Sequence, residues 1–282
     1  SALRSGALET DFAGPVTVRV TQTQAEIDAS GPLSRVGGAP IMQRLLARAR
    51  FTFDGRYDRR AQRLVMHSAT VESASARATA SGALGPGADG LNGRWRVSDA
   101  RAIDPRFSGA AEGAFTLTGG FAGAPFRLGV EGAGERFSAG LGPFDPLLGA
   151  RPKLSGVVTV LRGVTQIEQA TATGPALRLG ATGPVRNGVA DLAVEASARG
   201  PVRFGAATID GVADARGTLK GPLEAPTLVL TTDLSAFEAG GVTVQQPRIA
   251  LTLAPAGTAH RGRVEATGAI GRQRVQAGAD IS

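Results

Sequence analysis

Two histidines are the only imidazole groups in the chain, and they are the first candidates for acid–base chemistry or metal binding. Neither His67 nor His260 has a second histidine or a carboxylate at the spacing of a helical ligand pair. The chain has no cysteine, so thiol catalysis, disulfides and zinc–thiolate sites are excluded. No G-x-S-x-G nucleophile elbow is present. These residue types favour two surface histidines over a catalytic or metal centre.

Three glycines form a possible dinucleotide fingerprint. Gly85, Gly87 and Gly90 satisfy G-x-G-x-x-G, which holds a pyrophosphate when it joins a strand to the N-terminus of a helix. Here Pro86 lies inside the motif, and residues 91–97 have the pattern of a strand. We therefore expect a hairpin loop at this position and no nucleotide cofactor.

Carboxylate pairs offer a second route to catalysis. Asp210 with Asp214 and Glu131 with Glu135 could act as acid and base if a cleft held them at a defined separation. Both pairs lie in glycine-rich segments, and with a single Trp the chain supplies few aromatic platforms for sugars. An enzyme on a jelly-roll scaffold would require these four carboxylates in a polar pocket. We expect no enzyme activity, no cofactor and no metal.

The net charge of +7 raises nucleic acid as a partner. Lys153 and Lys220 are the only lysines, and the arginines are spread singly along the chain instead of forming one basic cluster. One Trp and one Tyr provide little surface for base stacking. We expect no nucleic-acid binding, and a solvated basic sheet face or attraction to anionic lipid headgroups instead.

Alternating apolar residues predict strands through most of the chain. Val16, Val18 and Val20 alternate with Thr17 and Arg19, which is the pattern of a half-buried antiparallel strand. Forty glycines and 16 prolines supply frequent turns. We predict an all-β fold: a long antiparallel β-meander curled into a β-taco or jelly-roll-like groove, with one or two short helices.

The pattern repeats after about a hundred residues. Leu219 follows Leu117 by 102 residues, and Pro226 follows Pro125 by 101. An amphipathic segment at 39–50 and a shorter one at 144–149 are the predicted helices, and they occupy matching places. We expect an internal repeat of roughly 41–140 and 143–241. Asn92-Gly93 and Asn187-Gly188 are further matched signals, typical of type I′ hairpin turns.

The 282 residues are expected to form one continuous elongated β-domain. No run approaches the ~18 apolar residues that a membrane helix requires. Because the chain begins at Ser1 in what reads as mid-strand, we interpret it as a fragment of a longer protein. A meander of this length must curl, giving either a closed sandwich with a dry core or an open trough with an apolar floor.

Three runs resemble the TamB family, the translocation and assembly module proteins within the AsmA-like group. They are FDPLLGARPKLSG from Phe144, GTLKGPLEAPTLVL from Gly217 and EAGGVTV from Glu238, and the similarity covers most of the chain from about Ile41. The resemblance implies a periplasmic β-groove in the Gram-negative envelope, with an inner-membrane anchor outside this segment. It also implies a role in outer-membrane biogenesis, with a TamA-like outer-membrane barrel as partner and phospholipid moving between the membranes.

On this basis we expect a hydrophobic groove that binds phospholipid acyl chains. Its predicted lining residues are Val16, Val18, Val20, Phe53, Phe115, Leu117, Phe126, Leu128, Val158, Val160, Leu177, Leu179, Leu219, Leu228, Leu230, Ile249, Leu251 and Leu253. Each of them could equally belong to an ordinary sandwich core. The alternatives are a structural β-solenoid or adhesin-like passenger without lipid cargo, which parallel strand pairing would favour, and a scaffold for outer-membrane protein assembly.

Overall fold

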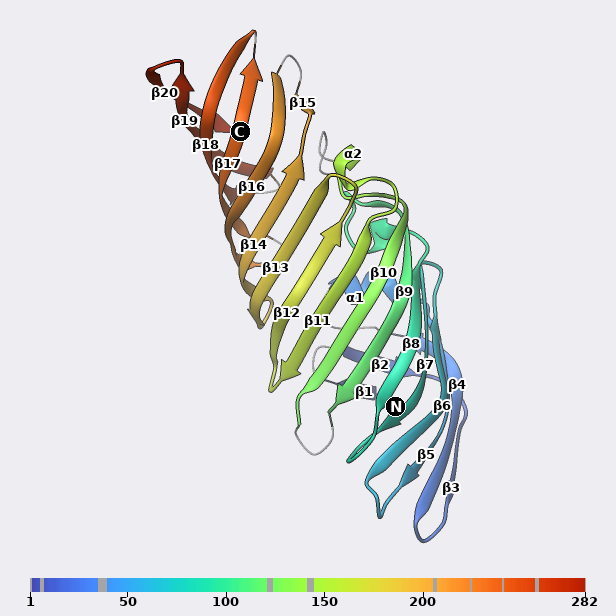
Figure 1. Ribbon diagram of the computed structural model, residues 1–282. Helices are drawn as coiled ribbons and strands as arrows, with labels where there is room; N and C mark the ends of the chain where they lie inside the picture. The colour runs from blue at the N-terminus through green and yellow to red at the C-terminus, as the bar shows by residue number, and fades with distance from the viewer. Residues whose placement is uncertain are drawn as a thin grey trace. The chain divides into compact units, whose positions relative to one another are not determined.

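The computed structural model describes residues 2–5, 8–34, 40–120, 124–140, 145–204, 207–223, 225–239, 241–256 and 259–281. These residues are mostly β-strand (Figure 1). Every strand pair with a defined register is antiparallel. The predicted all-β antiparallel meander with two short helices is therefore confirmed.

The chain divides into two compact units: unit 1 holds residues 1–140 and 153–165, and unit 2 holds 141–152 and 166–282. The prediction of one continuous domain stays a prediction. The elements of unit 1 are β1 (Ala2–Ser5), β2 (Leu8–Phe12), β3 (Val16–Val20), β4 (Gln24–Ser34), α1 (Pro40–Leu45), β5 (Arg50–Asp58), β6 (Arg63–Glu72), β7 (Ala76–Leu84), β8 (Gly90–Val97), the 3-10 turn η1 (Ala100–Ala102), β9 (Ser108–Gly119), β10 (Phe126–Ser138) and β11 (Lys153–Leu161).

Unit 2 continues the same meander. Its elements are α2 (Asp145–Leu148), β12 (Val164–Thr173), which begins at the last residues of unit 1, β13 (Leu177–Arg186), β14 (Val189–Arg199), β15 (Val202–Phe204), β16 (Ala207–Pro222), β17 (Thr227–Ala239), β18 (Val242–Ala256), β19 (Ala259–Ile270) and β20 (Gln273–Ile281). Consecutive strands from β16 to β20 pair with each other, so this part of unit 2 is a simple up-and-down sheet.

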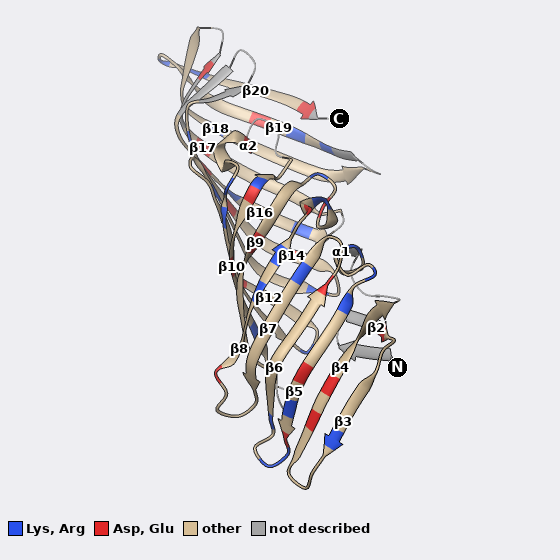
Figure 2. Ribbon diagram, turned by 90° about the vertical axis from the view of Figure 1, so that its right-hand side faces the viewer, with Lys and Arg blue, Asp and Glu red and all other residues tan. Residues whose placement is uncertain are grey.

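The alternation in the sequence sets which side chains are sheltered. Along β5, Phe51 and Phe53 are half-buried, whereas Thr52 and Asp54 between them are exposed. Neighbouring strands follow the same rule because residues opposite each other in a sheet point to the same side. Figure 2 shows the charged positions as separate bands along β4 and β5. Each strand thus directs its apolar side chains to one face of the sheet and its polar side chains to the other.

The best-defined core of unit 1 lies where α1 and β2 pack on one end of the sheet. Phe12, Leu33 and Ala49 are buried there, and Leu46 of the turn after α1 packs against them. The rings of Phe12 and Phe51 meet edge to face at 6.2 Å between centroids, a favourable aromatic geometry. The turn that follows the helix therefore packs on one end of the apolar side of the sheet.

The first helix is shorter than predicted. Residues 39–50 show a helical apolar pattern, but α1 ends at Leu45 and Arg48 adopts a left-handed conformation with φ of 53°. This reversal turns the chain back into β5 at Arg50, and Ala49 is fully buried at the corner. The second predicted helix, 144–149, is present as α2 over Asp145–Leu148, and residue 144 lies outside the described residues.

One of the two Asn-Gly turn predictions was wrong. Asn187 and Gly188 form the turn between β13 and β14, with φ of 50° and 77°, and the positive values at both positions are the type I′ signature. Asn92 and Gly93 instead lie inside β8. Glycine is needed there for another reason, because a Cβ at this position would lie 2.3 Å from Cζ of Phe115.

Candidate functional site

All ten predicted lining residues of unit 1 lie on one side of its sheet, which we call the apolar face. The register can be followed from β3 to β11, and it shifts at irregularities between β5 and β6, between β6 and β7 and between β9 and β10. Val18 is opposite Ile27, Leu117 is opposite Leu128, and Leu128 is opposite Val158. The ten residues are Val16, Val18, Val20, Phe53, Phe115, Leu117, Phe126, Leu128, Val158 and Val160.

Unit 2 has an apolar face of its own. Leu219 is opposite Leu228, which is in turn opposite Leu253, and Leu230 is opposite Leu251. The register from β13 to β18 places all eight predicted residues of this unit on the same side. These residues are Leu177, Leu179, Leu219, Leu228, Leu230, Ile249, Leu251 and Leu253.

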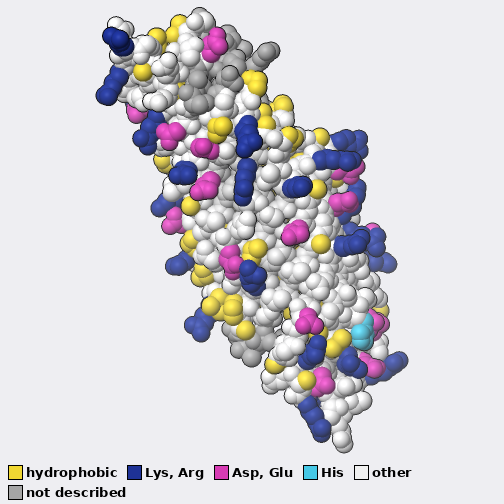
Figure 3. Space-filling model, viewed as in Figure 1, with side chains coloured by type: hydrophobic (Ala, Val, Ile, Leu, Met, Phe, Trp, Pro, Cys, Tyr) yellow, Lys and Arg dark blue, Asp and Glu magenta, His cyan; other side chains and the backbone are white. Residues whose placement is uncertain are grey.

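The other side of each sheet is polar. Thr159 and Arg127 are opposite each other on β11 and β10, and Asp233 and Arg248 are opposite each other on β17 and β18. Figure 3 shows Lys, Arg, Asp and Glu side chains scattered over the visible surface and not gathered in one block. The arginines and the acidic residues thus share a solvated face that carries both signs of charge.

Most of the apolar face remains accessible to solvent. Phe126 is 39% exposed and Val160 is 36% exposed, and Val20 at the edge strand β3 is 60% exposed. Of the 18 predicted lining residues only Leu177 is fully buried. The inner side chains of a closed sandwich would be removed from water. The exposure of these side chains favours an open apolar surface over a dry core.

Sequence reasoning missed the part that glycine plays on this face. The Cβ of an alanine at Gly132 would lie 2.6 Å from the Trp95 ring, so the indole reaches across the neighbouring strand to this glycine and leaves no room for a side chain. Phe115 likewise leaves no room for a side chain at Gly93. Trp95 Nε1 donates a hydrogen bond to the Ala114 carbonyl at 3.2 Å, which satisfies its N–H. The signal was an aromatic residue opposite or diagonal to a glycine, but it becomes visible only once the register is known.

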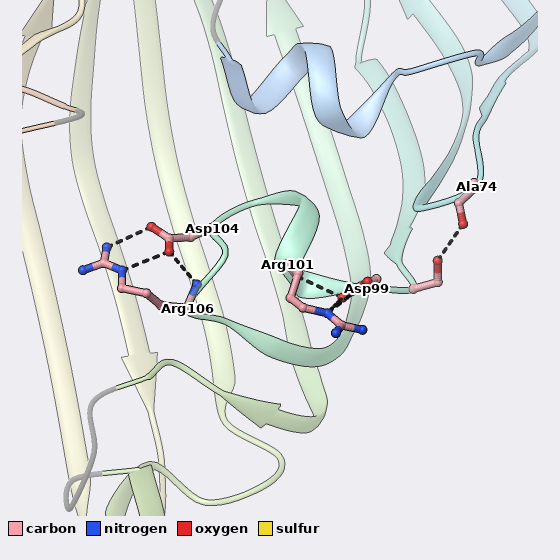
Figure 4. Close-up of polar contacts among 6 residues, drawn as sticks. Ala74, Asp99, Arg101, Asp104 and Arg106 are labelled. Carbon is pink, nitrogen blue, oxygen red and sulfur yellow. Dashed lines mark hydrogen bonds and ion pairs between the residues drawn. The ribbon is translucent and has the colours of Figure 1, made fainter. Parts of the chain in front are cut away.

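A hydrogen-bonded clamp joins α1 to the η1 loop at the end of β8. Arg44 Nε donates to the Ala102 carbonyl at 3.0 Å, and Nη2 donates to the Ile103 carbonyl at 2.7 Å. In the same loop Arg106 donates to Asp104, and this hydrogen bond lowers the pKa of Asp104 to about 2, with a smaller contribution from the positive charge of Arg44. Figure 4 shows this ion pair and a second one, Arg101 with Asp99. The clamp fixes the helix to the η1 loop.

Among the candidate catalytic residues whose side chains the structure describes, none assemble into a site. His67 is exposed on β6 with Nδ1 3.2 Å from Asp54 Oδ1, and the His260 side chain lies outside the described residues. Asp214 and Glu131 are exposed. Within the residues that the structure describes, no three His, Asp or Glu side chains are grouped to hold a metal ion.

Glu135 and Asp210 complete the carboxylate pairs. Glu135 lies 3.4 Å from Arg96 Nη2, and Arg96 also contacts Glu112. The Asp210 side chain lies outside the described residues. The G-x-G-x-x-G segment joins β7 to β8, a strand to a strand, as expected for a hairpin loop.

Shallow hollows on the polar side are lined by both signs of charge. One of about 620 Å³ in unit 1 includes Arg94, Arg96 and Glu112. Another, of about 340 Å³ in unit 2, includes Glu195 and Arg216. The mixed charges give neither hollow a preference for an anion or a cation, so the apolar faces are the stronger candidate site.

None of the described helices is both long and apolar enough to cross a membrane. In comparisons with known proteins, no family model, no curated protein and no solved structure matches this chain.

Proposed function

We propose that the apolar faces bind the acyl chains of phospholipids and that the chain is part of a lipid conduit in a bacterial envelope. The observation that carries this proposal is that the predicted lining residues of each unit lie on one side of that unit's sheet, and that all of them except Leu177 are at least partly exposed. A contiguous apolar surface that is exposed to solvent marks an interaction site. The proposal requires no nucleophile, metal or cofactor.

The energetics suit a lipid tail. Each methylene removed from water contributes about 0.8 kcal/mol, so even a few methylenes on the floor bind measurably. Neighbouring strands present similar side chains, such as Leu117, Leu128 and Val158 on adjacent strands. A tail could move from one strand to the next with little change in free energy, which is the property a conduit needs.

The wider setting of the proposal rests on the resemblance to the TamB family. In that setting the chain lies in the periplasm as part of an inner-membrane-anchored protein, and a TamA-like barrel meets another part of it. The antiparallel pairing of the strands disfavours the alternative of a parallel β-solenoid passenger.

Neighbouring valines on opposite sides of β11 provide the test. Val158 lies on the apolar face opposite Leu128, and Val157 lies on the polar face opposite Gly129. A photo-reactive benzoylphenylalanine at position 158 should cross-link to phospholipid when the purified protein is irradiated, and the same group at 157 should not. Val158→Asp should lower the amount of phospholipid that co-purifies, measured by native mass spectrometry, by roughly tenfold, because an acyl chain that covers a carboxylate removes it from water at a large cost in free energy.

Val157→Asp is the matched control, since it changes the same residue type one position away. Equal lipid loss in both variants would indicate loss of folding and not of binding, and the cross-linking experiment then decides. Absence of lipid from the wild-type protein and equal cross-linking at 157 and 158 would exclude the conduit.

A further inference from the structure

β3 lies at an open edge of the unit 1 sheet. Among the described residues β4 is the only strand that pairs with it. Figure 2 shows β3 as the outermost strand at this end of the sheet. Val16, Val18 and Val20 are 52%, 52% and 60% exposed, more than any other predicted lining residue. The outer side of β3 is therefore the least covered part of the apolar face.

The hydrogen bonds at the two ends of β3 show which of its residues face outward. Ser30 N donates to the Pro15 carbonyl at 3.3 Å, and Thr21 N donates to the Gln24 carbonyl at 2.8 Å. In antiparallel strands, residues that exchange hydrogen bonds with the neighbouring strand alternate with residues that do not. Pro15 and Thr21 flank β3 and both bond to the β4 side, so the odd-numbered residues of β3 face β4 and the even-numbered ones face outward.

The outward backbone groups belong to Val16, Val18 and Val20. Each of these valines directs an N–H and a C=O away from β4, into the space where a further strand would pair. Proline, lysine and β-bulges are the usual means by which edge strands avoid such pairing. β3 contains no proline or lysine, and its register with β4 has no shift. Its edge is thus open to the addition of a strand.

A second copy of β3 fits this edge by two-fold symmetry. Antiparallel pairing about Val18 places that residue opposite Val18 of the second copy, and it places Val16 opposite Val20 of the second copy. All three residues face outward, so their backbone groups meet as hydrogen-bonded pairs. Residues opposite each other in a sheet point to the same side, so the valine side chains of both copies meet on one face. The apolar face then continues from one copy into the other.

The charges on the polar side select this register. The same symmetry places Thr17 opposite Arg19 of the second copy. Within its own hairpin, Thr17 is opposite Asp28 and Arg19 is opposite Glu26. Each arginine therefore lies between its own Glu26 and, beyond the threonine, Asp28 of the other copy, and no like charges are directly opposite each other across the joint. A two-fold axis at Arg19 would instead place two arginines opposite each other.

We propose that two copies of this chain pair through β3 to form a two-fold dimer. The occupant of the edge is a second copy because it supplies an outward-facing valine for each outward-facing valine and a threonine for each arginine. The pairing uses backbone groups and needs no ligand. It joins the apolar faces of the two unit 1 sheets into one surface. Passage of a lipid tail from one copy to the other is the only consequence that rests on the proposed function.

Cysteine cross-linking tests the pairing, because the chain has no thiol of its own. In the full 282-residue protein, Val18→Cys lies on the two-fold axis, and its two Cα atoms should be about 5.5 Å apart, within reach of a disulfide. Val20→Cys is the matched control, since it changes a more exposed valine of the same strand, but its two copies lie about 13 Å apart along the strands. Mild oxidation should yield the disulfide dimer at least about tenfold faster for Val18→Cys.

Sedimentation velocity over a series of protein concentrations provides a second measurement. The wild-type protein should change from monomer to dimer as the concentration rises. Val18→Pro should raise the dimer dissociation constant at least roughly tenfold, because it removes an outward N–H while the hydrogen bonds to β4 come from the neighbouring residues. Val18→Ala keeps this N–H and should stay closer to the wild type. Circular dichroism checks that both variants are folded.

A wild-type protein that stays monomeric at every concentration would overturn the proposal. Equal cross-linking at positions 18 and 20 would overturn it too, because random collision then explains both products. Protein stripped of phospholipid with detergent and returned to buffer should dimerise as before. Absence of lipid from a purified protein that still dimerises would remove the conduit and leave the pairing through β3 intact.

Discussion

Each of the two helices contacts a turn between two strands, β6–β7 at α1 and β12–β13 at α2, and the two contacts differ in their chemistry. The hydrogen bond from Ser73 N to the Ala76 carbonyl, at 2.7 Å, recurs 101 residues later from Gly174 N to the Leu177 carbonyl, at 2.8 Å. At α1 the Ser73 hydroxyl donates to the Leu45 carbonyl at 2.6 Å. At α2 the Leu148 carbonyl lies where a side chain at 174 would begin, 2.1 Å from an added Cβ.

The difference shows that one backbone arrangement can be held by a hydroxyl or by close packing. Beside α1 the hydroxyl of Ser73 and the guanidinium of Arg44 hold the backbone through hydrogen bonds, and Leu46 after the helix is only partly buried at the margin of the core. Beside α2 the glycine lets the helix approach, and Leu148 and Pro152 are fully buried. Truncation of a fully buried leucine costs more stability than loss of a part-buried hydrogen bond, so the α2 contact should be the more sensitive to mutation.

Truncation of Leu148 should have the largest effect. Its side chain is 1% exposed, and Leu→Ala at such a site costs about 3 kcal/mol through lost transfer energy and the cavity left behind. Leu46→Ala beside α1 is the control and should cost about half as much. Urea unfolding followed by circular dichroism measures both variants. Equal losses would contradict the assignment of packing to α2 and hydrogen bonding to α1.

Removal of the Ser73 hydroxyl should have an intermediate effect. Ser73→Ala deletes the donor to the Leu45 carbonyl and the acceptor for Ala76 N, and we expect a loss of about 1 kcal/mol in the free energy of unfolding. Ser75→Ala, two residues away, should change it by less than about 0.5 kcal/mol. A Ser73→Ala protein as stable as wild type would show that the polar contact at α1 does not hold the turn.

The alternation of side chains predicted both the fold class and the common side of the lining residues. Val158 and Val160 carry that information in their own spacing, because the period of a strand is two. The turn at Asn187 followed from residue type alone. Asn92-Gly93 failed because the same dipeptide can lie in a strand when a ring such as Phe115 needs the space of a missing side chain. That information is held by the neighbouring strand and not by the local sequence.

The clamp between α1 and η1 was invisible for a related reason. Arg44 lies in the segment 39–50 that the sequence predicts as an amphipathic helix, and its side chain donates to carbonyls 58 and 59 residues away. Only the three-dimensional arrangement brings the loop within its reach. The sequence also did not decide whether the apolar face is exposed, since alternating valines and leucines suit a dry sandwich and a solvent-exposed surface equally well.

The smallest effect is expected in the α1–η1 loop and depends on pH. Hydrogen bonding to Arg106 lowers the pKa of Asp104 to about 2, below its usual value of 3.8, so the carboxylate is favoured in the folded state. Its stabilising contribution is complete above pH 3.8 and is lost as the pH falls through about 2. Asp104→Asn should therefore lower the unfolding free energy at pH 7 by about 0.5 kcal/mol, after allowance for solvent screening.

The pH dependence of stability distinguishes loss of the Asp104 charge from a structural disturbance, which would lower the free energy of unfolding equally at every pH. The difference between Asp104→Asn and wild type should shrink as the pH falls through about 2 and vanish below it, because the wild-type Asp104 then becomes neutral as well. Arg106→Gln should produce the same converging curves, since it removes the partner that lowers the pKa of Asp104. Parallel curves from pH 7 to pH 2 would mean that the loop is held by the backbone bonds of Arg44 to Ala102 and Ile103, and that the ion pair adds nothing to the clamp.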